Sequence, residues 1–167
     1  LELGSLNDDE KALAMMFFLT LLREHCETTR QSGDLAHLTV IEEAHRVMEN
    51  VPSHTGSEVV ADTRSRAVAA FSALLAEIRS YGEGILIAEQ SPEKLAPDAV
   101  RNTNLKLAHR LVAPKDREIM AGAMLLNQQG QDFLGRMGLG QAAVYTGGQQ
   151  QATFAAVPAW KKQAGFV

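Results

Sequence analysis

The chain has 167 residues, of which 46% are hydrophobic and 22% charged, and its formal net charge at pH 7 is −4. This composition indicates one globular domain with a core, and the net charge gives no overall attraction to nucleic acid or membranes, although a local basic surface is enough for DNA. The single cysteine, Cys26, excludes a disulfide framework and a cysteine-based zinc site and fits a reducing cytosol. No apolar run approaches the roughly 18 residues of a membrane span, and no signal peptide opens the chain. We expect a cytoplasmic protein from this cysteine usage. Because the chain begins with Leu1 and not with Met, and Leu-Glu-Leu reads as a strand entered partway, we also expect a piece of a longer protein.

Residues 1–3 are expected to be the end of a strand, and a long helix and a short strand follow. Asn7 and Asp8 can cap a helix that runs to about residue 29, and its first half is apolar nearly all round, which suggests burial against a sheet. Residues 38–41 are an apolar, β-branched run of the kind that forms a strand buried on both faces. A short helical segment is expected to follow over residues 44–49.

The middle of the chain repeats this order. Residues 50–61 have loop composition, and a second long helix is expected from about residue 62 to 81. Gly82 is a plausible left-handed end for this helix, and residues 84–88 form a second short buried strand. The alternation of strands and helices over the first 110 residues predicts a parallel α/β sheet.

The last third of the chain predicts one more strand, two helices and a hairpin. The strand covers about residues 105–111, and the helices cover 114–124 and 128–137. Glycines then mark a change to an apolar run at 142–145, and a Gly-Gly turn connects it to residues 152–157, which indicates a β-hairpin.

Two adjacent carboxylates, Glu42 and Glu43, end the first strand. The carboxyl ends of parallel strands are where open α/β sheets bind ligands. There the first acid can hold Mg²⁺, directly or through water, and the second can activate a water for attack on a phosphate, as in a Walker B motif. The alternative is a helix whose first turn carries acids that favour the positive end of its dipole.

Three further side chains fit this edge of the sheet. Gln90 follows the second strand, and its amide can hold a lytic water or sense a γ-phosphate; alternatively it caps the next turn. Arg110 closes the third strand at the same edge and can neutralise phosphate charge, or it makes a surface ion pair. His45 can orient Glu43 or contact a nucleotide, or it has a structural role at the start of a helix. The five histidines do not form a metal-ligand set.

Arg79 is expected at the opposite edge. It lies at the C-terminal end of the second long helix, which runs antiparallel to the strands, so it lies far from the phosphates of its own chain. If Arg79 touches a nucleotide, that nucleotide belongs to a neighbouring subunit. The alternative is a cation that favours a helix C-terminus.

A phosphate-binding Gly-x-x-x-x-Gly-Lys-Ser/Thr loop occurs nowhere in the chain, which therefore has a Walker B half without a Walker A half. Five segments in order nevertheless resemble the C-terminal half of the HerA-like ATPases, within the larger group that includes FtsK and conjugative or type IV secretion ATPases. These segments are residues 39–45, 76–84, 87–92, 101–104 and 109–111.

The resemblance implies a partial RecA-like three-layer sandwich: a mainly parallel sheet flanked by helices, with a C-terminal β-hairpin. Residues 1–158 would form the C-terminal half of this ATPase domain, with the Walker B and sensor region and no Walker A, and residues 159–167 a tail. The phosphate loop is expected upstream. The family assembles as a homo-hexameric ring that uses ATP and Mg²⁺ to move double-stranded DNA, and a nuclease or other effector is a further expected partner.

The resemblance also implies roles for single residues. Glu42 takes the metal-side position, Glu43 the catalytic base and Gln90 the sensor. Arg79 matches an arginine that acts on a neighbour's nucleotide, and Arg110 another family arginine of unassigned role. Glu42 stands where many relatives of the wider group have Asp, so its contact with the metal can pass through water. Residues 50–62 are longer than the shortest family members require, which leaves room for a mobile or a partner-binding loop.

Two other interpretations compete with this motor. The first is a non-catalytic ATPase-like module kept for assembly or partner binding, against which Glu43, Gln90 and the two arginines count. The second is an unrelated flavodoxin-like binding domain, in which the paired acids are a coincidence.

Overall fold

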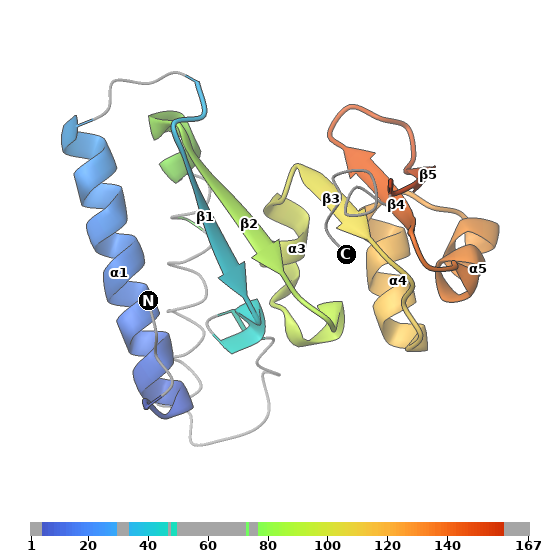
Figure 1. Ribbon diagram of the computed structural model, residues 1–167, viewed down its shortest axis with the longest axis horizontal. Helices are drawn as coiled ribbons and strands as arrows, with labels where there is room; N and C mark the ends of the chain where they lie inside the picture. The colour runs from blue at the N-terminus through green and yellow to red at the C-terminus, as the bar shows by residue number, and fades with distance from the viewer. Residues whose placement is uncertain (1–4, 30–33, 47, 50–72, 74–76, 159–167) are drawn as a thin grey trace, which may run out of the picture. The chain divides into compact units, whose positions relative to one another are not determined.

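The computed structural model describes residues 5–29, 34–46, 48–49, 73 and 77–158. It divides the chain into two compact units, Leu1–Asn102 and Thr103–Val167. In the described residues the first unit holds a pair of parallel strands and the second an antiparallel sheet of three strands (Figure 1). The chain is therefore a mixed α/β protein with a C-terminal hairpin, as the sequence predicts. Among the described residues no helix has the length and apolar character needed to cross a membrane.

Helix α1 (Asp8–Thr29) begins where the sequence predicts. The side-chain oxygen of Asn7 accepts a hydrogen bond from the Glu10 N–H, and the Glu10 carboxylate accepts one from the Asn7 N–H, both at 2.9 Å. This reciprocal pair satisfies two backbone donors that a helix start otherwise leaves without partners. Figure 1 shows α1 running in the opposite direction to the neighbouring strands.

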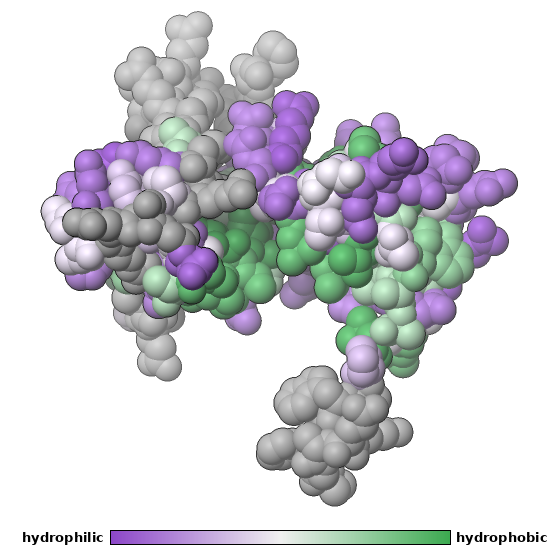
Figure 2. All heavy atoms as spheres, turned by 90° about the horizontal axis from the view of Figure 1, so that it is seen from above, coloured by the Kyte–Doolittle hydropathy of each residue, from purple (hydrophilic) through white to green (hydrophobic). Residues whose placement is uncertain are grey.

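The burial expected all round the first half of α1 is wrong for this structure. Leu19 and Cys26 are buried, whereas Leu13, Phe17 and Leu21 are exposed. Because residues four positions apart lie on the same side of a helix, these three form one exposed apolar row. Figure 2 colours one face of the molecule by hydropathy and shows both hydrophobic (green) and hydrophilic (purple) residues at the surface.

Strands β1 (His37–Glu42) and β2 (Glu83–Ala88) pair in parallel, with His37 opposite Glu83 and Glu42 opposite Ala88. Gly82 turns the chain into β2 with φ +73°, and a Cβ there would lie 2.6 Å from the Asp34 carbonyl oxygen, so glycine is required. The left-handed end predicted at Gly82 is thus confirmed.

A buried carboxylate joins the two strands at their beginnings. Glu83 accepts hydrogen bonds from the Thr39 hydroxyl and from Nδ1 of His37, each at 2.7 Å. Its side chain is fully buried, so these contacts compensate for the loss of hydration. They fix the register of the pair at the edge away from Glu42.

The prediction that β1 is buried on both faces is wrong. Ile41 is 3% exposed, but Leu38 and Val40 are 48% and 54% exposed. Successive side chains of a strand point to opposite faces, so Leu38 and Val40 share one face. On β2 the exposed Leu86 lies opposite Val40. The described residues therefore cover only one face of this pair.

Short elements surround the strands: η1 (Ala44–Arg46), η2 (Arg79–Tyr81), η3 (Pro92–Lys94) and α3 (Pro97–Asn102). The helical segment expected over residues 44–49 is a single 3-10 turn, and Glu49 instead forms an isolated bridge with Leu95. The loop expected over residues 50–61 and most of the helix expected over residues 62–81 lie outside the described residues.

The second unit contains β3 (Leu105–Ala108), α4 (Pro114–Ala123), α5 (Gln128–Arg136), β4 (Gln141–Thr146) and β5 (Thr153–Ala156). The two helices and the β4–β5 hairpin confirm the prediction. The third strand differs from it in two respects: it ends at Ala108 and not at residue 111, and it pairs antiparallel with β4. Pairing with a strand more than thirty residues later carries no local signal, which is why the sequence pattern did not predict it.

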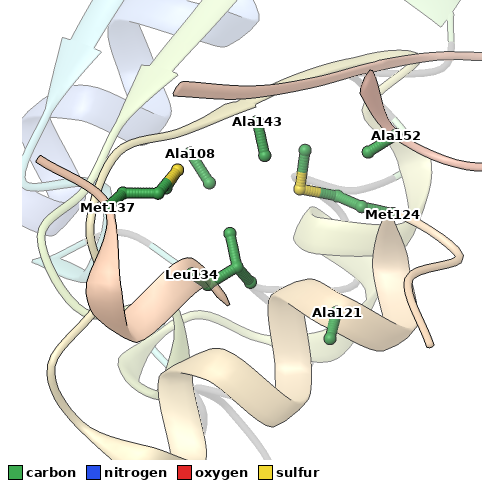
Figure 3. Close-up of a cluster of buried hydrophobic side chains, with 7 residues drawn as sticks. All are labelled: Ala108, Ala121, Met124, Leu134, Met137, Ala143 and Ala152. Carbon is green, nitrogen blue, oxygen red and sulfur yellow. The ribbon is translucent and has the colours of Figure 1, made fainter. Parts of the chain in front are cut away.

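A small core holds the second unit together. Figure 3 shows Met124, Leu134 and Met137 converging on alanines from β3, β4 and the neighbouring segments. Lys106 is also buried; its ammonium donates to the Thr103 carbonyl oxygen at 2.5 Å and lies 5.6 Å from the centre of the Tyr145 ring. Burial lowers the pKa of Lys106, because it penalises the charged form.

Candidate functional site

The candidate site lies where β1 and β2 end. The two strands are parallel and Glu42 is opposite Ala88, so the residues that follow each strand meet at one edge. Glu42 and Glu43 come from the first strand, and Glu89 and Gln90 from the second. The predicted meeting of Glu42, Glu43 and Gln90 at this edge is therefore what the register produces.

Glu43 has an unusual backbone at the turn out of β1. Its φ is +50°, in the left-handed region, which costs a side-chain-bearing residue about 1–2 kcal/mol. Nε and Nη2 of Arg46 both lie 2.8 Å from Glu43 Oε2, and the Arg46 N–H donates to the Glu43 carbonyl oxygen at 3.0 Å. These contacts hold the turn and leave Oε1 of the same carboxylate for another partner. The Glu43 side chain is 49% exposed, so water can reach it.

A second carboxylate, Glu89, connects the two strand ends. Its Oε2 accepts from the backbone N–H of His45 at 3.1 Å and from His45 Nδ1 at 2.7 Å. Its Oε1 accepts from the N–H groups of Gln90 at 2.8 Å and Ser91 at 3.2 Å. The Glu89 side chain is only 6% exposed, so one buried carboxylate receives four N–H donors from both strand ends.

The electrostatics of Glu89 follow from this arrangement. Burial by itself raises the pKa of the carboxyl, but the hydrogen bonds from His45, Ser91 and Gln90 together outweigh it and lower the pKa. Glu89 is therefore ionised at neutral pH and can only accept, so Nδ1 of His45 carries the proton. Nε2 is then the ring nitrogen that remains for a ligand.

A Mg²⁺ ion at this edge would have few protein ligands. Among the described residues no group of three or more His, Cys, Asp or Glu side chains could hold a metal ion by itself. Mg²⁺ bound with a nucleotide typically needs only one or two carboxylates, because waters and phosphate oxygens complete its octahedron. The exposed Glu42 carboxylate suits that mode.

The remaining predicted site residues lie elsewhere. Arg79 lies in η2, four residues before β2 begins, and thus at the edge opposite Glu43. The six-residue strands separate the two edges by roughly 17–20 Å. Arg110 lies two residues after β3 ends, exposed in the second unit. No strand pairing in the described residues joins β3 to β1 or β2, so the shared edge of Arg110 and Glu43 stays a prediction.

Sequence reasoning missed Glu89 and Arg46. Glu89 was visible as a polar residue after the second strand, but its partner His45 is 44 positions away, and only the parallel register brings them together. Arg46 carried a local signal, because it stands three residues after Glu43 in a turn.

Comparison with known proteins gives a likeness of fold. No protein-family model matches the sequence, and neither does any curated protein. Among solved structures, VirB4 of Thermoanaerobacter pseudethanolicus superposes with a TM-score of 0.68 at 18% identity, over 96% of this chain and 41% of that one.

The genome packaging NTPase B204 from Sulfolobus turreted icosahedral virus 2, in complex with ATP-gammaS, gives a TM-score of 0.61 at 13% identity, over 95% of this chain and 65% of that one. B204, the DNA-packaging ATPase from Sulfolobus turreted icosahedral virus, gives 0.52 at 12% identity, over 72% of this chain and 52% of that one. The chain thus spans about two fifths to two thirds of the length of these neighbours. At these identities, what the chain shares with the packaging NTPase B204 and with VirB4 is their α/β fold.

Proposed function

We propose that this chain is the C-terminal part of an ATP-hydrolysing, ring-forming DNA translocase of HerA type, whose phosphate-binding loop lies in sequence upstream of residue 1. The observation that carries the proposal is the pair Glu42 and Glu43 at the carboxyl edge of two parallel strands. The likeness of fold to B204, which is named a DNA-packaging ATPase, and to VirB4 supports it. The complexes of B204 with ATP-gammaS, AMPPCP, AMP and sulfate support a nucleotide as ligand.

In this function Glu43 accepts the proton of the attacking water through Oε1, while Arg46 holds Oε2. Glu42 would hold Mg²⁺, which neutralises charge on the phosphate oxygens when bound. Gln90, exposed beside Glu89, orients the water, and Nε2 of His45 faces the nucleotide. Arg110 contributes a cation whose place in the mechanism we leave unassigned.

The place of Arg79 supports the proposed assembly. Arg79 belongs to the edge opposite Glu43, so if it contacts a nucleotide, that nucleotide is bound by a neighbouring subunit. A homo-hexameric ring provides such interfaces and encloses double-stranded DNA. The exposed apolar face formed by Leu38, Val40 and Leu86 supports additional protein layers in the intact molecule.

The test is an ATPase assay of the full-length protein that contains this chain, with and without double-stranded DNA. We expect Mg²⁺-dependent hydrolysis that DNA stimulates and that Glu43→Gln removes. A full-length protein that binds ATP but does not turn it over under any of these conditions would instead indicate an ATPase-like module for assembly or partner binding.

A further inference from the structure

We propose that Glu89 is a positioning residue: its buried carboxylate fixes the turn that carries Glu43 and aims the His45 ring. The inference rests on the proposed function for its catalytic consequence, but its structural basis is independent of any nucleotide. The four hydrogen bonds described above connect the turn after β1 to the turn after β2 through one side chain.

The strained backbone of Glu43 needs support from its neighbours. A left-handed backbone at a residue with a side chain persists only where its surroundings hold it. The backbone bond from the Arg46 N–H to the Glu43 carbonyl oxygen closes this turn, whereas the partly exposed Arg46–Glu43 ion pair contributes little. The two residues between them are also held, because Ala44 is fully buried and the His45 N–H donates to Glu89. Glu89 is therefore the buried side chain that anchors this turn.

The four partners of residue 89 match the chemistry and length of a glutamate. All four partners are N–H donors, and an ionised carboxylate only accepts, so every contact is matched. A glutamine of the same shape would place an NH₂ group against two of these donors. An aspartate keeps the charge but is one methylene shorter. It can still bind the N–H groups one and two residues ahead, as aspartates commonly do in turns, but it cannot also reach His45.

Glu89 affects the site through the His45 ring. Two hydrogen bonds to adjacent positions of His45, its backbone and its ring, fix the direction in which the ring points. Loss of a side chain that positions an active-site residue typically lowers activity by about 10- to 100-fold, because the groups that contact the substrate move. Glu89 itself touches neither water nor nucleotide in the mechanism above.

The experiment uses the full-length protein and three variants: Glu89→Gln, Glu89→Asp and the control Glu118→Gln, which removes one exposed carboxylate from α4. The first measurement is hydrogen–deuterium exchange at the resolution of single amides, in the absence of nucleotide. In Glu89→Asp the His45 amide should exchange about tenfold faster or more, while the Gln90 and Ser91 amides keep their protection. In Glu89→Gln either the His45 amide or the Gln90 and Ser91 amides should lose protection, depending on which side the new NH₂ group faces. The α1 amides and the control should not change, which separates loss of the anchor from loss of folding.

Steady-state kinetics then measure the catalytic consequence. We expect kcat for ATP to fall about 10- to 100-fold in both Glu89 variants with KM nearly unchanged, and no change in Glu118→Gln. Two further variants, His45→Ala and the combined Glu89→Asp/His45→Ala, complete a double-mutant cycle. The combined variant should lose less kcat than the product of the two single losses, because Glu89 acts partly through His45.

Three outcomes overturn the inference: unchanged protection of the His45 amide in Glu89→Asp, unchanged kcat in both variants, or losses of kcat that multiply fully in the combined variant. If the wild-type protein does not hydrolyse ATP, the proposed function fails, and the exchange measurement still decides whether Glu89 holds the turn.

Discussion

The substitution Glu43→Gln separates catalysis from folding at this site. Glutamine has the shape of glutamate and keeps one oxygen, which can still accept from Arg46. It cannot take a proton from water. In the full-length protein we therefore expect turnover to fall while ATP binding is kept.

The expected losses of rate and of stability differ greatly in size. Loss of a general base typically costs about 10²–10⁴-fold in rate, or about 2.7–5.4 kcal/mol in the activation barrier. The stability change is much smaller, because the Glu43–Arg46 pair is partly exposed and such pairs contribute at most about 1 kcal/mol. The melting temperature should thus fall by less than about 4 °C.

The assay pairs single-turnover hydrolysis with binding of a fluorescent ATP analogue and thermal melting, with Glu118→Gln as the matched loss of an exposed carboxylate. The assignment of Glu43 as base is refuted if the variant hydrolyses ATP within about tenfold of wild type. A large fall in melting temperature would show instead that Glu43 is a structural residue.

Four other predictions follow from the same structure. The isolated chain should show no micromolar ATP binding in calorimetry with Mg²⁺, because the amides and lysine of a phosphate loop supply most of the affinity and are absent; micromolar binding would contradict the half-site. Rings of Arg79→Ala or Glu43→Gln subunits should be inactive alone, but mixed rings should regain single-site hydrolysis; a fully active Arg79→Ala ring would reduce Arg79 to a helix-end cation. Leu134→Ala should destabilise the chain by about 2–5 kcal/mol in denaturant unfolding, since Leu134 is fully buried, and the fully exposed Leu139→Ala should change it by less than about 0.5 kcal/mol. Because the folded-state pKa of Glu89 is lowered, its charge should stabilise the protein above the ordinary glutamate pKa of about 4.3, and the stability difference from Glu89→Gln should vanish as the pH falls through the lower folded-state value.

Sequence patterns predicted the elements whose signals are local. The start of α1 rests on Asn7 and Glu10, three residues apart, and the end of the turn before β2 rests on Gly82. Strands β1 and β2 were visible as short apolar runs ended by acids, so the meeting of Glu42 and Glu43 with Gln90 at one edge needed only parallel pairing. Each of these inferences uses contacts within a few residues or a single rule of topology.

The patterns failed where burial depends on distant partners. The apolar side chains of α1 and β1 indicate that another layer of the protein covers them, but they do not indicate which part of the protein supplies that layer. In this structure Phe17 and Val40 are exposed. Glu89 shows this most clearly. A charged residue directly after a strand is typical of a solvent-exposed strand end, and the amide of Gln90 suits the role of sensor better than a carboxylate does. Its burial is favourable only because His45, from the other strand, supplies two of its four donors. A residue of this kind becomes recognisable once the register of the two strands is known, since the register determines which donors surround it.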